Sequence, residues 1–337
     1  MGVIIYPNKL KTGDTVGITA VSMPANDEKI DIAINNLKEL GLKVIETSNV
    51  RSTGIVSSSG KKRAEELLEL YKNPDVKYII AARGGEFLME MLPYLKGHED
   101  IIRNNVKWFQ GFSDPSLLNL FITTNFNIAT INMENISEYA MKPRFKSLQD
   151  SLDFMFSNSN EFIQESFEKY QKQEFEEGNL KGYNLTEKNI YECDANNVKF
   201  EGRLIGGCID VFSLIAGTDL DKIEEFVSQF DDEGVIWYLD NCELAPCEFY
   251  RRLWYMKQKN YFKNVKGFLI GRSLMQNINN EFFSFKDAVE RALKEFNVPI
   301  VYNVDTGHIP PQMCMINGSY AIFEYNNGKG KLIQKLI

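Results

Sequence analysis

The chain has 337 residues, a length that accommodates about two domains. Hydrophobic residues make up 44% and charged residues 25%, which excludes a disordered chain, a collagen-like fibre and a disulfide scaffold. The 38 basic and 46 acidic residues give a net charge of -8, which argues against nucleic acid as a partner. The chain has two histidines, His98 and His308, so a mechanism that requires a histidine has few candidate residues.

The N-terminal residues do not resemble a secretory signal, and no stretch approaches the ~20 apolar residues of a membrane span. The five cysteines form no CxxC pair, so the sequence predicts neither a zinc site nor a disulfide framework. We therefore expect a cytoplasmic protein with buried thiols and no membrane partner. Cys242 and Cys247 flank a polar segment, but neither lies near a histidine in sequence, which argues against a thiol nucleophile.

Short apolar strands alternate with amphipathic helices through the first 130 residues. We predict strands at 15–21, 43–46, 76–82 and 108–111 and helices at 27–40, 60–72 and 117–124. This alternation is typical of an α/β fold with a parallel sheet and helices on both faces. Ligands bind such sheets at the carboxyl ends of the strands, so the turns after the strands are the first places to look for function.

The character of the sequence changes after residue 157. Residues 161–178 are rich in Glu, Gln and Lys and poor in aliphatic side chains, which predicts a surface helix running into a connecting loop. A second apolar domain follows, with strands expected at 234–239, 267–270 and 321–325. We therefore set an N-terminal α/β domain at 1–157, a helix and connecting segment at 158–198, and a C-terminal domain at 199–337.

Two glycines, Gly84 and Gly85, follow the predicted strand 76–82 directly after Arg83. Glycine adopts backbone conformations that are closed to other residues. The turn therefore either only connects a strand to a helix, or leaves room for a substrate to approach backbone N–H groups. Two roles are open to Arg83 as well, an ion pair with a substrate carboxylate and an internal ion pair.

Ser113 lies in the turn between the predicted strand 108–111 and the predicted helix 117–124. Asp114 suits an N-cap and Pro115 the first helical position, which places Ser113 just before the helix. A serine there can be exposed, with adjacent N–H groups facing a developing oxyanion. The turn resembles a nucleophile elbow, although the GxSxG pattern is absent. The alternative is that Ser113 only assists the helix cap.

His308 lies between Asp305-Thr306-Gly307 and two prolines, in what we expect to be a rigid loop. A lone histidine is usually structural. His98, however, lies in a polar and exposed stretch, so His308 is the better candidate for a catalytic base.

A serine nucleophile needs a base, and the base needs an acid that orients it. Asp240 stands at the carboxyl end of the buried run 235–239, and Glu243 follows three residues later. Either residue could be that acid. The alternative is that both cap the helix expected near 248–256.

Together these segments resemble the LD-carboxypeptidase family of serine peptidases, which also includes the microcin C immunity proteins. The motifs that carry the resemblance are Leu10-Lys11-Thr12-Gly13-Asp14, Ser22, Arg83-Gly84-Gly85, Gly111-Phe112-Ser113-Asp114, Gly206-Gly207, Gly217-Thr218, Leu239-Asp240, Arg252-Leu253 and Gly307-His308. Each motif is short, but their order and spacing over nearly the whole chain make the set specific.

The resemblance implies hydrolysis of the amide between an L-centre and a terminal D-amino acid, typically D-alanine, of cytoplasmic muropeptides. It matches Ser113 to the nucleophile, His308 to the general base, and the N–H groups of Gly85 and Asp114 to the oxyanion hole. Arg83 and Gly84 are the candidates for substrate binding.

The same resemblance implies an N-terminal α/β domain and a β-rich α+β C-terminal domain with the site between them. It also implies a homodimer, a small peptide with a D-amino acid terminus as the partner, and neither a metal nor a cofactor.

The chain departs from the family pattern at three places. Asp240 stands where the family has a glutamate, Glu86-Phe87 replaces Tyr-Gly, and Asn132-Met133-Glu134 replaces His-Gly-Pro. Three functions therefore remain open: a muropeptide carboxypeptidase, a microcin-immunity-type hydrolase of peptidyl or aminoacyl adenylates, and a binding protein that has lost catalysis.

Overall fold

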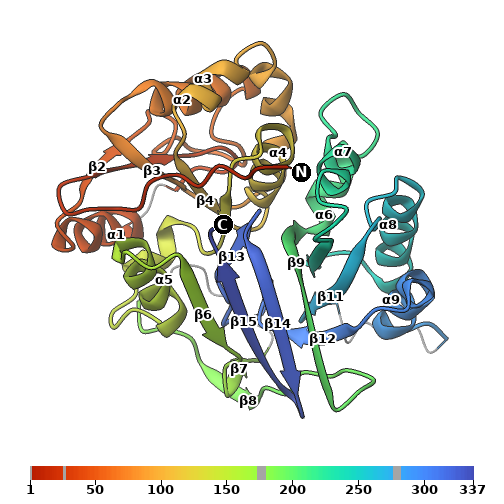
Figure 1. Ribbon diagram of the computed structural model, residues 1–337. Coiled ribbons are helices and arrows are strands. Elements are labelled where there is room, and N and C mark those ends of the chain that lie inside the picture. Colours follow the sequence, from red (N-terminus) through yellow and green to blue (C-terminus); the bar gives the residue numbers. More distant parts are fainter. Residues whose placement is uncertain (1, 26–27, 173–179, 276–281) are drawn as a thin grey trace. The chain divides into compact units, whose positions relative to one another are not determined.

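The computed structural model describes residues 2–25, 28–172, 180–275 and 282–337 (Figure 1). The chain divides into two compact units. The N-terminal unit comprises Ile4–Ser159 and Glu176–Tyr183, and the C-terminal unit comprises Met1–Val3, Asn160–Phe175 and Asn184–Ile337. Among the described residues, no helix is both long and apolar enough to cross a bilayer.

The N-terminal unit is an α/β layer structure. Its strands are β1 (Thr15–Thr19), β2 (Lys43–Glu46), β3 (Val76–Ala81), β4 (Trp108–Gly111) and β5 (Thr130–Asn132). Its helices are α1 (Glu28–Glu39), α2 (Gly60–Lys72), α3 (Glu99–Asn104), α4 (Ser116–Phe126) and α5 (Lys146–Phe156), with 3-10 turns η1 (Leu88–Leu95) and η2 (Ile136–Ala140). The strands lie in the order β5-β4-β3-β1-β2, and every neighbouring pair is parallel.

The sequence patterns explain these elements. The apolar residues of α1 recur at helical spacing, and Ile30, Ala33, Ile34 and Leu37 are all buried. The predicted strands 43–46 and 108–111 and the helix 60–72 have the observed bounds, and the other observed ends lie within two residues of the predicted ones. Residue 27, the first residue of the predicted helix 27–40, lies outside the described residues. The predicted parallel α/β fold is therefore confirmed for this unit.

The C-terminal unit is built on a mixed sheet. Its strands are β6 (Glu161–Glu165), β7 (Lys169–Gln171), β8 (Leu185–Lys188), β9 (Asn197–Cys208), β10 (Val235–Asp240), β11 (Val265–Gly271), β12 (Ile300–Val304), β13 (Met315–Asn317), β14 (Tyr320–Asn326) and β15 (Lys329–Lys335). Its helices are α6 (Ile209–Phe212), α7 (Ile223–Ser228), α8 (Pro246–Gln258) and α9 (Phe285–Leu293), with 3-10 turns η3 (Ser213–Ile215) and η4 (Lys294–Phe296).

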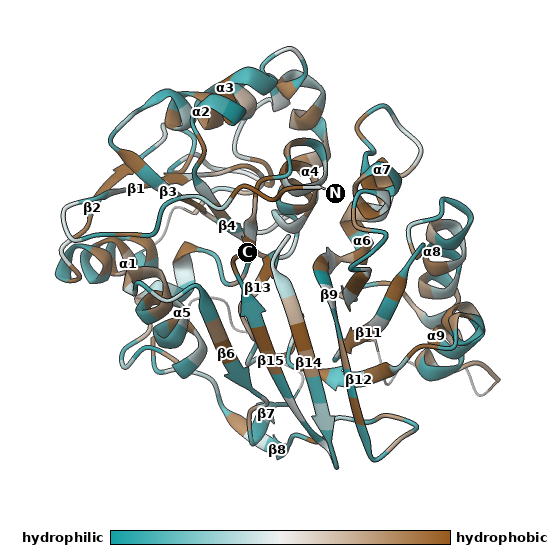
Figure 2. Ribbon diagram, in the orientation of Figure 1, coloured by the Kyte–Doolittle hydropathy of each residue, from teal (hydrophilic) through white to brown (hydrophobic). Residues whose placement is uncertain are grey.

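The sheet of this unit has the order β12-β11-β10-β9-β14-β15-β6. Strands β9 to β12 are parallel to one another, whereas β14 is antiparallel to β9 and to β15, and β15 is antiparallel to β6. Figure 2 shows hydrophobic stretches along β11, β14 and β15, and the buried core includes Leu204, Tyr238, Leu269 and Phe323. The carboxyl ends of β9, β10, β11 and β12 lie at one edge of the sheet, which is where a ligand site is expected.

The surface helix that we expected within 161–178 is wrong for the residues that the structure describes. Residues 161–165 form β6, which pairs with β15, and 169–171 form β7, which pairs with β8. Exposure alternates along β6, where Phe162 and Gln164 are buried between exposed neighbours. An edge strand with one solvated face carries many charged residues, and that composition suggested a helix. Residues 173–178 of this stretch lie outside the described residues.

Candidate active site

Ser113 lies in a strained turn between β4 and α4 of the N-terminal unit. Its φ is 67°, in the left-handed region, which costs a non-glycine residue about 1–2 kcal/mol. The side chain is partly exposed at the carboxyl edge of the parallel sheet. Strain of this kind is concentrated at functional sites, because only a specific need keeps it.

Asp114 does not cap α4, so that prediction is wrong. The helix begins at Ser116 with no side-chain cap, and Pro115 precedes it. The Asp114 carboxylate instead accepts hydrogen bonds from Ser22 Oγ at 2.5 Å and from the Leu88 N–H at 2.9 Å. Burial raises the pKa of Asp114, although these two hydrogen bonds oppose the shift. Asp114 therefore connects the Ser113 turn to the loop after β1, through Ser22, and to the first residue of η1, Leu88.

The segment after β3 packs directly against the serine turn. A Cβ atom placed on Gly84 would lie 3.1 Å from Ser113 Cβ and 3.2 Å from Ser113 Oγ, so glycine permits this close approach. Arg83 and Gly85 flank it and are half-buried. In the part of the chain that the structure describes, neither the Gly85 N–H nor the Asp114 N–H donates a hydrogen bond.

Glu134, in place of the last residue of the family's His-Gly-Pro, is buried behind β5. Its Oε1 lies 3.5 Å from the hydroxyl of Tyr183, and burial raises the pKa of Glu134 to about 7. A carboxyl group in such surroundings holds its proton to a higher pH because its charged form is poorly solvated.

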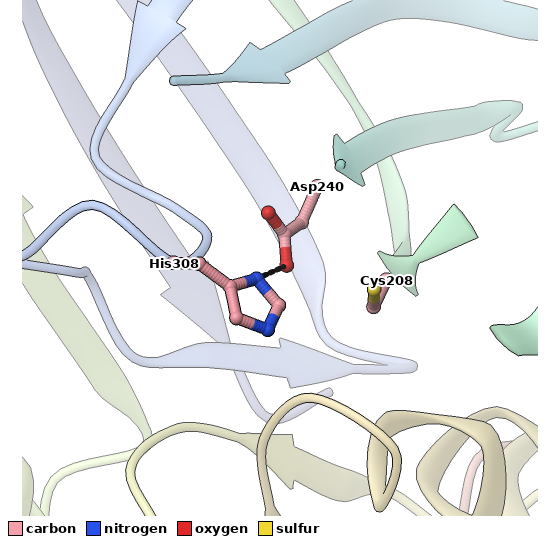
Figure 3. A group of neighbouring side chains, drawn as sticks. All are labelled: Cys208, Asp240 and His308. Carbon is pink, nitrogen blue, oxygen red and sulfur yellow. Dashed lines mark ion pairs between the residues drawn. The ribbon is translucent and has the colours of Figure 1, made fainter. Parts of the chain in front are cut away.

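The acid and base candidates of the C-terminal unit lie side by side. Asp240 ends β10 and His308 lies in the loop after β12, and His308 Nδ1 is 2.8 Å from Asp240 Oδ2 (Figure 3). Their residues are only 1% and 6% exposed. Burial favours the neutral imidazole, but the charge of Asp240 outweighs it, and the pKa of His308 lies well above its ordinary value.

Gly307 makes this contact possible. Its φ is +109°, and a Cβ atom there would lie 2.2 Å from Asp240 Oδ1. Any other residue would both strain the backbone and collide with the carboxylate. The glycine before His308 therefore fits the loop to Asp240.

Glu243 lies on the exposed turn after β10. Its backbone N–H donates to Asp210 Oδ1 at 2.7 Å, and the N–H of Cys242 donates to Asp210 Oδ2 at 3.1 Å. Asp210 therefore holds this turn. The cap position of α8 is Ala245, without a side-chain cap, so the alternative that Asp240 and Glu243 cap this helix is wrong.

A buried ion pair that we did not predict supports the His308 loop. Arg272 Nη1 lies 2.6 Å from Asp305 Oδ1, and both side chains are almost fully buried. Arg272 also donates to the carbonyl oxygens of Ile309 and Pro311, on the far side of the histidine. Tyr191 Oη donates to Asp305 Oδ2 at 2.5 Å. The loop is thus held before and after His308.

A signal for this pair was present in the sequence. Arg272 follows the apolar strand β11 directly, at the sheet edge where Asp240 ends β10. A charge at the end of a buried strand needs a partner, and Asp305 directly follows β12. From the sequence alone, several residues could be the partner of Arg272 or of Asp305. Only the structure shows that these two residues pair with each other.

One group of described residues carries metal-ligand atoms close together. Cys208, Asp240 and His308 each offer one such atom, and these atoms lie within 4.8 Å of one another.

Comparisons with known proteins agree with this two-part organisation. A profile of the LD-carboxypeptidase N-terminal domain matches residues 16–133, and a profile of the LD-carboxypeptidase C-terminal domain matches residues 201–322. The "Probable murein peptide carboxypeptidase" of Bacillus subtilis (strain 168) is 23% identical over 318 residues, which cover 94% of this chain and 90% of that protein.

Two further similar proteins have MccF in their names. The "Microcin C7 self-immunity protein MccF" of Escherichia coli is 22% identical over 332 residues, covering 94% of this chain and 92% of that protein. The crystal structure of an MccF-like protein from Bacillus anthracis str. Ames matches with a TM-score of 0.81 at 24% identity, covering 98% of this chain and 99% of that one. At this identity the structural match shows a shared fold.

Proposed function

Because the chain belongs to the LD-carboxypeptidase family, we propose that it is a serine carboxypeptidase acting on muropeptides. Its substrate bond is the amide between an L-centre and a terminal D-amino acid. The observation that carries the proposal is the buried contact between Asp240 and His308, since an acid that orients an imidazole is what a serine peptidase needs. The strained turn at Ser113 supports the same chemistry.

The proposed reaction is acyl transfer in two steps. His308 takes the proton of Ser113 Oγ while this oxygen attacks the scissile carbonyl carbon. The N–H groups of Gly85 and Asp114 donate to the oxyanion, and one such donor is worth about 3–4 kcal/mol of barrier. His308 then gives the proton to the leaving amine, and water hydrolyses the acyl-enzyme through the same base.

Asp240 has two tasks in this scheme. It fixes the proton of the neutral imidazole on Nδ1, so that Nε2 is the atom that accepts the serine proton. It also stabilises the imidazolium that forms, which the raised pKa of His308 reflects. Arg83 would bind the terminal carboxylate of the substrate, whose position distinguishes a carboxypeptidase from an endopeptidase.

The test is release of D-alanine from a muropeptide with an L,D-tetrapeptide stem. The wild type releases D-alanine, and the same peptide with a terminal L-alanine is not cut. Ser113→Ala and His308→Ala abolish release. The exposed histidine provides the matched control, because His98→Ala removes the same side chain from the N-terminal unit and retains activity. Release that survives Ser113→Ala contradicts the mechanism.

The similarity to MccF supports a second substrate class, a peptidyl or aminoacyl adenylate. The same three side chains would perform this cleavage, so the substrate alone separates the two functions. Comparing kcat/KM on the muropeptide and on an aminoacyl adenylate decides between them. Failure to cleave either substrate would instead favour a binding protein without catalysis.

We further propose a homodimer that works in the cytoplasm. All five cysteines are described and free; Cys208 and Cys314 are buried as expected, but Cys247 is exposed, so the expectation of buried thiols is wrong for Cys247. The dimer follows from the family resemblance, and light scattering of the purified chain tests it.

A further inference from the structure

A buried thiol adjoins the acid and base at the end of the C-terminal sheet. Cys208 ends β9, and it stands directly opposite Asp240 in the parallel register between β9 and β10. Figure 3 shows the Cys208 side chain beside the pair formed by Asp240 and His308. Thiol, carboxylate and imidazole are thus gathered in one buried place, with one ligand atom of each within 4.8 Å of the others.

The carboxylate of this group lacks the partners that a buried charge normally has. Asp240 is 1% exposed, and apart from the 2.8 Å contact between its Oδ2 and His308 Nδ1, no hydrogen bond to its carboxylate is found among the described residues. Buried carboxylates nearly always accept several hydrogen bonds or bind a cation. A cation would therefore supply this carboxylate with a second partner.

We propose that Cys208, Asp240 and His308 form an inhibitory binding site for a thiophilic divalent cation of the Zn²⁺ or Cd²⁺ type. Thiolate sulfur, imidazole nitrogen and carboxylate oxygen are the ligands that zinc takes in proteins. Three protein ligands leave a fourth position for water. Hard cations such as Mg²⁺ prefer oxygen ligands and are not expected to bind.

The spacing is close to what such an ion needs. With bonds of about 2.0–2.3 Å in a tetrahedron, ligand atoms lie roughly 3.3–3.6 Å apart. Nδ1 and Oδ2 lie 2.8 Å apart, so they would separate slightly, and the sulfur would move inward. Side-chain rotation supplies displacements of this size without a change in the backbone.

Binding would remove the catalytic base. The cation binds Cys208 Sγ, Asp240 and His308 Nδ1, the thiol proton leaves to solvent, and the ring proton moves from Nδ1 to Nε2. A neutral imidazole carries one proton, so Nε2 could then no longer accept the proton of a serine. The inhibition rests on the proposed function, whereas the binding itself does not.

Cd²⁺ binding to the intact chain tests the site without an enzyme assay. We expect one equivalent of Cd²⁺ to bind with a thiolate-to-cadmium charge-transfer band in the ultraviolet. Cys208→Ala should abolish the band and weaken binding by about 100-fold or more, since even the outer partners of metal ligands are worth about 10–100-fold. Cys208→Ser serves the same purpose if the alanine variant does not fold, which thermal unfolding reports.

Two other thiols provide matched controls. Cys314 is buried elsewhere in the same unit and Cys247 is exposed, so Cys314→Ala and Cys247→Ala should keep the band. A wild type without the band, or a band that survives in folded Cys208→Ala and Cys208→Ser, overturns the proposal. A band lost only in Cys247→Ala also overturns it, because it assigns the cation to the surface.

The inhibition is tested by D-alanine release with and without Zn²⁺. We expect Zn²⁺ to lower the rate of the wild type, a chelator to restore it, and the ratio of the two rates to approach one in Cys208→Ala. Equal inhibition in Cys208→Ala overturns the inhibitory role. If no substrate is cleaved at all, the proposed function fails, while the Cd²⁺ experiment still decides the site.

Discussion

The choice between Asp240 and Glu243 as the catalytic acid leads to a sharp prediction. Asp240→Asn keeps the shape of a side chain that is 1% exposed but removes its charge from a position 2.8 Å from His308 Nδ1. Glu243→Gln removes a charge from the exposed turn three residues later. If Asp240 orients the base, only the first change should cause a large loss of activity.

The structure gives the size of that loss. At an effective dielectric constant of about 20, unit charges roughly 3–4 Å apart attract each other by about 4–6 kcal/mol. The imidazolium formed in the transition state loses this attraction in Asp240→Asn. Since about 1.4 kcal/mol corresponds to tenfold in rate, kcat should fall by about 10³–10⁴-fold, in line with the about 10⁴-fold loss known for the equivalent change in a Ser-His-Asp triad.

The assay is the initial rate of D-alanine release over a range of muropeptide concentrations, so that kcat and KM are separated. Thermal unfolding of each variant excludes loss through misfolding. The loss should lie in kcat for Asp240→Asn, and Glu243→Gln should stay within about twofold of the wild type. The reasoning is refuted if the two variants lose similar activity, or if folded Asp240→Asn keeps more than about a tenth of kcat.

Further predictions concern stability. Ser113→Gly should be about 1 kcal/mol more stable than Ser113→Ala in urea unfolding, because glycine tolerates the φ of 67°; an equal or lower stability would show that the turn is unstrained. Arg272→Met should lower the free energy of unfolding by about 3–5 kcal/mol, because it leaves the Asp305 carboxylate buried without its ion-pair partner. The double variant Arg272→Met with Asp305→Leu should recover part of this free energy. A loss below about 1 kcal/mol in Arg272→Met would contradict the buried pair. The pKa of Glu134 is about 7 in the folded protein and 4.5 ordinarily, so the wild type loses stability as the pH rises between these values. Relative to the wild type, Glu134→Gln should therefore gain up to about 3 kcal/mol in free energy of unfolding between pH 4 and pH 8. A gain that does not grow with pH would refute the buried carboxyl.

The elements of the N-terminal unit were predictable because local and tertiary signals agree there. Helix α2 shows both a helical apolar period and an N-cap at Ser59, which accepts from the Lys62 N–H. All residues of β1 and β4 are buried, as is typical of parallel strands that are covered on both faces. The prediction for the residues of β6 was wrong because the charged side chains on its exposed face obscure the period of two that is typical of a strand. Its pairing with β15 stabilises the strand, and this pairing is not visible in the local sequence.

The candidate site was predictable where a residue ends a strand and only partly elsewhere. Asp240 and Ser113 could be placed at sheet edges from sequence, since strand ends are visible in the apolar pattern. The sequence does not distinguish Asp240 from Glu243 as the acid, because the conformation of the turn between them determines which side chain faces the loop of His308. The partners of Asp114 were also hidden, since Ser22 and Leu88 lie far from it in the chain.

The account depends most directly on Ser113 as the nucleophile that His308 activates. Rapid quenching of the reaction with the muropeptide, followed by mass spectrometry of the digested protein, measures where the acyl group forms. We predict an adduct equal to the peptide without its terminal D-alanine, on the fragment that contains Ser113, and no adduct in His308→Ala. Release of D-alanine with the acyl group on another residue, or an undiminished adduct in His308→Ala, would contradict the account.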